Sequence, residues 1–316
     1  MRILGIDIGG TKCAVVLGNE TGEILKKERF ATVGCTETLE RLRALAAGMA
    51  PFDAIGVSCG GPLDAARGVI LSPPNLPGWD HVEIVRLLSE RFHVPVFLKN
   101  DADACALAEW RFGAGKGAQN LIFLTFGTGL GAGLILNGRL YSGACGLAGE
   151  AGHLRLADFG PVGHGKAGSF EGFCSGGGLA QLGQAAAVAH AQQGCPVGFT
   201  GGEITAKALA EAAYGGDAAA IEVFRQCGRM LGRGLSLLID LLNPERILLG
   251  GIFGRCESLL RPEMEKEIEK EALPASRRAC AILPAALGEA IGDVGALCAA
   301  LDGLQTAQQQ KKEAFV

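Results

Sequence analysis

Two short stretches of this sequence place bare main-chain amides at the end of an apolar run. The first, "ILGIDIGGTK" at 3–12, has an acid, Asp7, inside the run and a polar turn after it. Consecutive N–H groups beside a hydroxyl suit a polyphosphate, and a nearby carboxylate can hold Mg²⁺ through water. The predicted phosphate turn consists of Gly9, Gly10, Thr11 and Lys12.

The same plan recurs in the second half of the chain. In "NLIFLTFGTGLGAGLILNGRLY", 120–141, Thr125 stands where Asp7 stood, and another glycine turn follows. One such turn can be explained as a tight hairpin with a capping acid. The repeat favours instead a nucleotide held between the two halves, and so does a third glycine turn, which ends the run at 246–252. The nucleotide-binding residues predicted in this half are Gly127, Thr128, Gly129, Gly250 and Gly251.

Two better-known phosphate loops do not fit. "GAGKG" at 113–117 lacks the Gly-Lys-Ser/Thr ending of a P-loop. "GTGLGA" at 127–132 matches a dinucleotide fingerprint, but a strand and an Asn-Gly turn follow it where that motif requires a helix.

The surrounding pattern predicts two duplicated α/β halves. Each half begins with a strand, a glycine turn and a strand, and continues with strands and helices of helical apolar spacing. A helix is expected over 80–93 with Asp80 as its N-cap, and a last helix over 289–303 with a frayed polar tail after it. The predicted domains are a smaller one, 1–115 plus 290–316, and a larger one, 116–289.

Composition excludes several classes of protein. A formal net charge of −4 over 316 residues gives no sign of a nucleic-acid or anionic-membrane partner. No apolar run approaches the roughly 18 residues of a membrane span. The 11 cysteines form no C-x2-4-C pair, and an odd count without a signal peptide fits reduced thiols, so we expect a cytoplasmic protein.

Five motifs together resemble the ROK family of sugar kinases and repressors. They are "DIGGTK", "GPLD…PPNLPGW", "NDADACALAEW", "TFGTGLGAGLILNG" and "GEAGH", in the family's order and spacing over about residues 1–303. The resemblance implies an α/β, two-domain, actin-like or hexokinase-like ATPase fold built of duplicated ribonuclease-H-like halves. It also implies ATP and Mg²⁺ as cofactors, a hexose or N-acetylhexosamine as acceptor, and a homodimer.

The kinase branch of the family is the better match. Its repressors carry a helix-turn-helix ahead of the kinase module, whereas here the first strand begins at Arg2 and the chain is acidic. The expected reaction is phosphorylation of glucose to glucose 6-phosphate. Fructose, mannose, allose, N-acetylglucosamine and N-acetylmannosamine remain open as substrates. So does a non-catalytic sugar-sensing regulator, although the intact Asp7, Thr11, Asn100 and Asp101 argue against it.

The resemblance also assigns roles to individual residues. "KND", 99–101, ends a buried strand and opens a helix, and its Asp101 matches the family's catalytic base. A helix N-cap is the alternative role for Asp101, and Asp103 is expected to be structural. The implied sugar-binding residues are Gly61, Asn75, Asn100, Asp101, Glu150, His153 and Glu171.

The chain departs from the family at one place. Most members have a C-x-C-G-x-x-G-C zinc motif after the Gly-His, and that histidine is also a ligand. Here "VGHGKAGSFEGFCSG", 162–176, puts Val162, His164 and Ser169 at the three cysteine positions. A closed four-ligand site cannot be built from these residues. We therefore predict no structural zinc, and expect glycine turns and inward-packed Phe170 and Phe173 to hold the loop.

Overall fold

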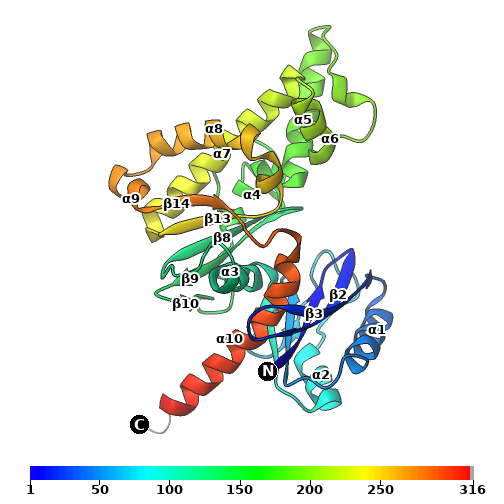
Figure 1. The fold of residues 1–316 in the computed structure, drawn as a ribbon. Helices are drawn as coiled ribbons and strands as arrows, with labels where there is room; N and C mark the ends of the chain where they lie inside the picture. The colour runs from blue at the N-terminus through cyan, green and yellow to red at the C-terminus, as the bar shows by residue number, and fades with distance from the viewer. Residues whose placement is uncertain (314–316) are drawn as a thin grey trace.

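The computed structural model describes residues 1–313 and consists of two lobes, each built on a five-stranded sheet (Figure 1). The strands of the first sheet are β1 (Arg2–Ile8), β2 (Lys12–Asn19), β3 (Ile24–Ala31), β4 (Ala54–Cys59) and β7 (Val96–Asn100). Those of the second sheet are β8 (Leu121–Phe126), β9 (Leu130–Leu136), β10 (Arg139–Leu140), β13 (Arg246–Leu249) and β14 (Ala281–Pro284). Two small hairpins add β5 (Leu63–Asp64) with β6 (Val69–Ile70), and β11 (Val162–Gly163) with β12 (Lys166–Ala167).

The two sheets share one topology, as the repeat in the sequence predicts. Their strand orders are β3-β2-β1-β4-β7 and β10-β9-β8-β13-β14. In each sheet an antiparallel hairpin, β1–β2 or β8–β9, pairs with parallel strands on the other side of its first strand. The glycine turns predicted from the sequence close these two hairpins, so they occupy equivalent places in the two lobes.

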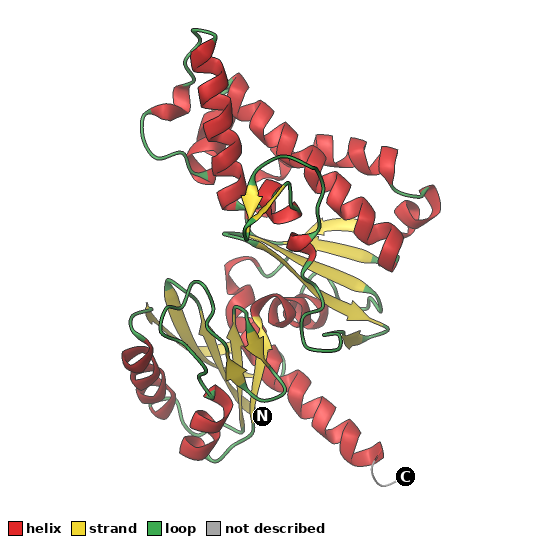
Figure 2. Cartoon of the chain, turned by 180° about the vertical axis from the view of Figure 1, so that it is seen from behind, coloured by secondary structure: helices red, strands yellow, loops and turns green. Residues whose placement is uncertain are grey.

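The helices cover both faces of each sheet. They are α1 (Cys35–Ala47), α2 (Ile84–Phe92), α3 (Asp101–Phe112), α4 (Phe170–Phe173), α5 (Gly176–Gln192), α6 (Ala206–Tyr214), α7 (Ala218–Leu242), α8 (Ile252–Glu271), α9 (Pro274–Ala279) and α10 (Ile291–Glu313). Three short 3-10 helices are η1 (Ala151–His153), η2 (Gly198–Thr200) and η3 (Gly288–Ala290). Seen from behind, α1 and α2 lie on one side of the first sheet and α10 on the other (Figure 2).

Three expectations from the sequence are wrong in detail. The second helix begins at Ile84, not at 80, and Asp80 accepts a hydrogen bond from the Ser72 hydroxyl instead of capping it. The polar tail does not fray at 304, because α10 continues to Glu313. The strand expected over 246–252 ends at Leu249, and its last glycine is the N-cap of α8. Residues 314–316 of the predicted smaller domain lie outside the described residues, and the domain division stays a prediction.

Helix α10 packs unusually closely on the first sheet. A side chain on Gly56 of β4 would place its Cβ 2.0 Å from the Ala296 carbonyl oxygen, and one on Gly5 of β1 would lie 3.1 Å from the Ala296 Cβ. Glycine inside a strand is weak by propensity but admits a close backbone approach. These mid-strand glycines therefore allow α10 to pack directly against the middle of β1 and β4.

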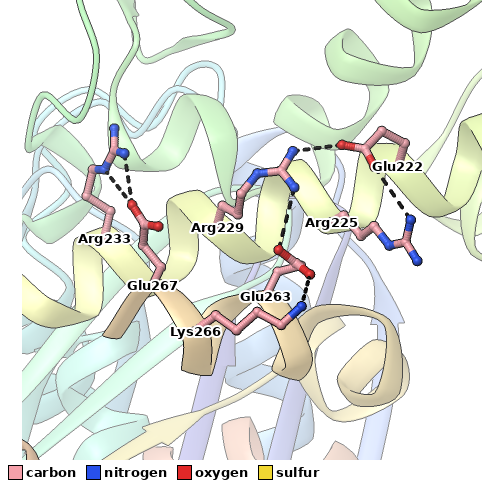
Figure 3. A network of polar contacts seen from close by, with 7 residues as sticks. All are labelled: Glu222, Arg225, Arg229, Arg233, Glu263, Lys266 and Glu267. Atoms are coloured by element: carbon pink, nitrogen blue, oxygen red, sulfur yellow. Dashed lines mark hydrogen bonds and ion pairs between the residues drawn. The ribbon is translucent and has the colours of Figure 1, made fainter. Parts of the chain in front are cut away.

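Helices α7 and α8 cover the second sheet and are linked by a polar network (Figure 3). The Arg233 guanidinium lies 2.9 Å from the Glu267 carboxylate, and Arg229 lies between Glu222 at 2.7 Å and Glu263 at 3.6 Å. Exposed ion pairs contribute little singly, so the apolar contact between the two helices carries most of their stability. None of the helices formed by residues 1–313 has the length and apolar character needed to span a membrane.

Candidate functional site

The polar residues of the first sheet gather where its parallel strands end. In register, Asp7 of β1 lies beside Ser58 of β4, and Ser58 beside Lys99 of β7. Asn100 and Asp101 follow Lys99 directly, at the junction of β7 and α3. Ligands of α/β sheets bind beyond such carboxyl ends. The structure thus brings Asp7, Asn100 and Asp101 to one edge, as the sequence predicted.

Asp7 is half-buried at this edge. Burial, together with the negative charges of Asp101 and Asp293, raises the pKa of its carboxyl group to about 6, although the Ser58 hydroxyl and Arg29 act in the opposite direction. A side chain on Gly292, at the start of α10, would lie 2.8 Å from the Asp7 carboxylate. The carboxylate therefore lies directly against the start of α10, where only a glycine leaves room for it. A single partly exposed carboxylate is the kind of group that binds Mg²⁺ through water, so Asp7 fits the Mg²⁺ predicted there.

The phosphate turn is held by backbone and by one threonine. The Gly9 N–H donates to the Lys12 carbonyl at 3.2 Å, which closes the turn. The Thr32 hydroxyl donates to the Gly9 carbonyl at 2.6 Å, and the Thr32 N–H donates to the Thr11 carbonyl at 3.0 Å. Gly10, Thr11 and Lys12 are exposed. Their donors are thus open to a ligand, while the carbonyls behind them are fixed.

The loop that carries Asn75 packs against this turn. A Cβ on Gly10 would come within 2.6 Å of the Asn75 carbonyl oxygen. The predicted sugar-binding Asn75 therefore lies directly beside the predicted phosphate turn, with its side chain exposed.

Asn100 caps α3, and Asp101 is the first residue of that helix. Asn100 is the N-cap of α3 and accepts from the Ala102 N–H at 2.9 Å. One Asp101 oxygen accepts from the same N–H at 2.9 Å. The Asp101 carboxylate is open to solvent, yet the protein surrounds it closely enough that burial raises its pKa, against the lowering effect of that N–H. The alternative role of Asp101 as the N-cap is therefore only partly confirmed. Its carboxylate accepts from a helix N–H, but Asn100 occupies the N-cap position.

Two glycines that follow the end of β4 lie at the same edge of the sheet. A Cβ on Gly60 would lie 3.7 Å from the Asp101 carboxylate, and one on Gly61 would lie 3.4 Å from the Asn100 amide nitrogen. The predicted Gly61 turn therefore lies within reach of both polar side chains. A small ligand can approach Asp101 there without a side chain in its path.

The glycine turns of the second sheet form a separate cluster with a helix N-terminus. The Gly127 N–H donates to the Gly129 carbonyl at 3.0 Å, and the Gly127 carbonyl accepts from the Gly176 N–H at 2.8 Å. Gly251 has φ +64°, and a Cβ there would lie 2.1 Å from the Phe126 carbonyl. Gly127, Gly129, Gly250 and Gly251 thus meet beside the start of α5. Thr128 is exposed at the tip of the turn.

This second cluster meets the first edge at α3. Strand β9 packs on α3 so closely that a Cβ on Gly133 would lie 2.4 Å from the carbonyl oxygen of Ala102, the neighbour of Asp101. Thr125, at the place equivalent to Asp7, accepts from the Gly131 N–H at 3.0 Å through its hydroxyl. The acid of the first lobe is therefore replaced in the second by a neutral, satisfied hydroxyl.

The three residues predicted on the sugar loop lie on two short helices. Glu150 and His153 flank and end η1, and both are exposed. Glu171 lies on α4, where its carboxylate accepts from the Leu130 N–H at 3.0 Å. Glu171 is therefore half-buried and joins the sugar loop to the glycine turn at 127–129, rather than being a free surface acid. Phe170 and Phe173 pack inward, as predicted.

The residues at the family's zinc positions do not fit a zinc ion. Val162 has no donor atom, and the buried Ser169 hydroxyl accepts from the Gly172 N–H at 3.0 Å. Within residues 1–313, no three His, Cys, Asp or Glu side chains come together as metal ligands. His153 and His164 do meet, with ring centroids 5.5 Å apart, but two histidines are half of a closed site.

Several residues at the site escaped sequence reasoning. Thr32 holds the phosphate turn, Ser58 faces Asp7, and Gly176 joins the second glycine cluster. The buried Ser58 hydroxyl also lacks a well-formed hydrogen bond to any described residue. Only Gly176 left a signal, since Ser175-Gly176 begins an apolar helix with a capping serine.

Comparison with known proteins agrees with this fold and site. The ROK family model matches residues 3–302. A glucokinase of Halalkalibacterium halodurans is 31% identical over 306 residues, covering 92% of each chain. The structure of a Streptomyces griseus ROK glucokinase in complex with glucose and AMPPNP is 32% identical, with a TM-score of 0.78 over 95% of this chain and 99% of that one. The Escherichia coli transcriptional regulator NagC is 30% identical over 287 residues, 87% of this chain and 69% of NagC.

The two mixed sheets and their glycine turns define an actin-like ATPase fold, as predicted. The chain belongs to the ROK family, whose similar members include sugar kinases and repressors. The resemblance inferred from the five sequence motifs is thereby confirmed.

Proposed function

We propose that the protein is an ATP-dependent hexose kinase that converts glucose to glucose 6-phosphate. The observation that carries the proposal is the position of Asp101. Its carboxylate is solvent-accessible at the start of α3, beside the side-chain-free Gly60 and Gly61 and on the same sheet edge as Asp7. A base fixed at this edge can reach an acceptor hydroxyl that faces a nucleotide held by the glycine turns.

The chemistry follows from these positions. The Asp101 carboxylate takes the proton of the sugar hydroxyl as that oxygen forms its bond to the γ-phosphorus, and ADP leaves with the electrons of the broken P–O bond. Burial raises the pKa of Asp101, which brings a carboxylate base nearer to neutral pH, where it is most effective. Mg²⁺, held by Asp7 through water, would neutralise charge on the phosphates.

Nucleotide and sugar would be bound by different groups. The exposed turn Gly9–Lys12 and the cluster around Gly127 offer N–H donors to the phosphates. Carboxylates, amides and a histidine discriminate well among sugars. A sugar that lacks a matching hydroxyl leaves one of these protein groups without a hydrogen-bond partner. The proposed sugar-binding residues are Gly61, Asn75, Asn100, Asp101, Glu150, His153 and Glu171.

The relatives support glucose as the acceptor. The Halalkalibacterium halodurans relative is a glucokinase, and the Streptomyces griseus structure contains glucose with AMPPNP. The other hexoses and N-acetylhexosamines named above remain candidates. NagC supports the second candidate, a regulator that binds sugar without turnover.

A coupled ADP-release assay with ATP, Mg²⁺ and a panel of hexoses and N-acetylhexosamines tests the proposal. We expect turnover with glucose and the highest kcat/KM for it. Sugar binding by calorimetry without turnover on any acceptor would favour the regulator, and a preference for another sugar would replace glucose.

We also propose that the chain forms a cytoplasmic homodimer through α7. This helix exposes Leu237 by 47% and Leu241 by 78%, and Leu273 beside its end by 61%. A row of exposed leucines favours an association surface. Sedimentation equilibrium of wild type and Leu241→Lys should show a dimer and a weakened dimer; a wild-type monomer would refute this proposal.

A further inference from the structure

Each of the three positions where the family's zinc cysteines are expected has a different contact in this chain. Val162, His164 and Ser169 lie in or next to the β11–β12 hairpin, which is adjacent in space to Glu171 and η1. We propose that these contacts replace the zinc, with Gln181 as the principal positioning residue, so that this member of the family presents its sugar-binding residues without a structural metal.

The first position is held by a side-chain amide. The Val162 N–H donates to the Gln181 carbonyl oxygen at 2.8 Å, and the Gln181 amide nitrogen donates to the Val162 carbonyl at 2.9 Å. This paired geometry repeats what a neighbouring strand would offer. Gln181 projects from α5, whose Gly176 contacts the glycine turn at 127–129. The hairpin is therefore anchored to the helix that also begins at the nucleotide cluster.

The second position is held by a ring contact and a lysine. His164, at φ +46°, turns its ring edge-on to His153 at 5.5 Å between centroids and 72° between planes. The Lys166 ammonium donates to the His153 carbonyl at 2.6 Å. Both groups of the hairpin thus act on His153, the residue that would otherwise be oriented by the metal.

The third position has become a helix cap. Ser169 is fully buried, and its hydroxyl caps α4, the helix that carries Glu171. The segment on either side of it is fixed by the Arg155 guanidinium, which donates to the Ala167 carbonyl at 2.8 Å, and by the Phe170 N–H, which donates to the Leu154 carbonyl at 2.8 Å. Where a cysteine would bind metal, serine fixes the N-terminus of the Glu171 helix.

These contacts act on the two residues, His153 and Glu171, that the proposed function assigns to sugar hydroxyls, so the role of Gln181 rests on that function. Loss of Gln181 should loosen the hairpin and weaken sugar binding. The nucleotide cluster should be affected less, since the bonds among Gly127, Gly129 and Gly176 are made by backbone. A separation of sugar from nucleotide affinity would distinguish positioning of the loop from general instability.

The test uses the full-length protein and the variant Gln181→Ala, with Gln184→Ala as control, because Gln184 lies on the same helix and is exposed. Glucose and AMPPNP affinities are measured by calorimetry, before and after dialysis against a chelator, and zinc is measured by mass spectrometry. The loss of two hydrogen bonds predicts a roughly three- to thirtyfold rise in the glucose Kd for Gln181→Ala. The AMPPNP Kd, the control variant and the chelated wild type should stay within about twofold.

Three results would overturn the proposal: about one zinc per chain in the wild type, loss of glucose binding on chelation, or an unchanged glucose Kd in Gln181→Ala. If Gln181→Ala does not fold, amide exchange of the wild type decides instead. Protection of residues 155–157 and 168–172 must then be the same with and without chelator. If the wild type binds glucose but does not phosphorylate it, the proposed kinase fails while the positioning role stands. If it binds no hexose, metal content and amide exchange judge the loop alone.

Discussion

The two glycine turns occupy equivalent places in two sheets of the same topology, yet their chemistry differs. The first lies beside two carboxylates, Asp7 and Asp101, that lie close enough for the charge of Asp101 to raise the pKa of Asp7. The second has Thr125 at the place of Asp7, and its hydroxyl is satisfied by the Gly131 N–H. In our proposal the first lobe therefore supplies the base and the metal ligand, and the second supplies neutral donors.

The difference also concerns what fixes each turn. The Thr32 hydroxyl supplements a backbone bond in the first turn, whereas the second has main-chain bonds from Gly127 and Gly176 and a carboxylate, Glu171, that belongs to the sugar loop. Substitutions in the first lobe should therefore change chemistry and local stability separately. In the second lobe, substitutions should act mainly by filling the space that the nucleotide would occupy. Four predictions test this contrast, beginning with the largest effect.

Asp101→Asn should lower kcat by about 10²–10⁴-fold, the usual contribution of a general base. Glucose affinity should change much less, because the amide keeps the shape of the side chain. Steady-state kinetics with calorimetric binding measure both. Asp103→Asn is the matched control. This acid lies on the same helix, but it is buried, which raises its pKa to about 7, so it is not placed to meet a sugar hydroxyl. Near-normal turnover in Asp101→Asn, or an equal loss in Asp103→Asn, would remove Asp101 from its role.

Asp7→Asn should stabilise the protein at high pH while impairing the reaction. The folded-state pKa of Asp7 is about 6, against 3.8 as the ordinary value. Since the folded state holds this proton more tightly, Asp7 lowers the free energy of unfolding as pH rises from about 4 to about 6. Without Mg²⁺, urea unfolding at pH 8 should show Asp7→Asn more stable by about 1–3 kcal/mol.

That gain should shrink as the pH falls through about 6 and vanish below about 3.8, where the wild-type carboxyl becomes protonated in both states. Equal stability of the two proteins at pH 8 would show that burial does not raise this pKa. A gain that stayed constant with pH would point to packing instead of charge.

Gly127→Ala should weaken ATP use without weakening the fold. No heavy atom of the described chain lies within 4 Å of a Cβ placed there, so the protein itself tolerates the methyl group. A phosphate against this turn would not, and a displacement of about 1 Å can cost about 10²-fold. We expect kcat/KM for ATP to fall about 10–100-fold with an unchanged Tm.

Gly254→Ala is the control for that change. It is also free of contacts within 4 Å, but it lies inside α8 rather than in the turn. Its kinetics should match wild type. Normal ATP kinetics in Gly127→Ala would place the nucleotide elsewhere and break the proposed division between the lobes.

Thr32→Val should have the smallest effect. It removes the hydrogen bond to the Gly9 carbonyl, worth about 0.5–1.5 kcal/mol, and should raise the KM for ATP a few-fold. Thr32→Ser keeps the hydroxyl and should behave as wild type. Equal KM values in the two variants would show that the first turn does not depend on its side-chain contact.

The parts predicted from sequence are those encoded by local pattern. Alternating apolar runs, bare glycine turns and the Asn-Asp at a strand-to-helix junction gave both sheets and the residues at their edges. The N-cap prediction for Asp80 was wrong. Aspartate is a common capping residue, but here its side chain accepts a hydrogen bond from Ser72. The helical tail misled because its polar residues follow a buried helix that packs on the sheet and continues outward.

Long-range contacts left no local signal. Thr32 lies 23 residues from the Gly9 that it holds, and Gln181 lies 19 residues from Val162. Gly56 and Gly292 have no room for a side chain, because the Ala296 carbonyl and the Asp7 carboxylate, respectively, lie against them although both are far away in the chain. A single sequence shows such residues as an ordinary threonine, glutamine or glycine, and only the fold brings their partners within reach.

The most direct test of the account is a crystal structure of the wild type with glucose and AMPPNP bound together. We predict that the Asp101 carboxylate lies within about 2.6–3.2 Å of one sugar hydroxyl, with that oxygen in line with the γ-phosphorus and the phosphates on the glycine turns of both lobes. An Asp101 carboxylate far from every sugar oxygen, or phosphates bound away from both turns, would contradict it.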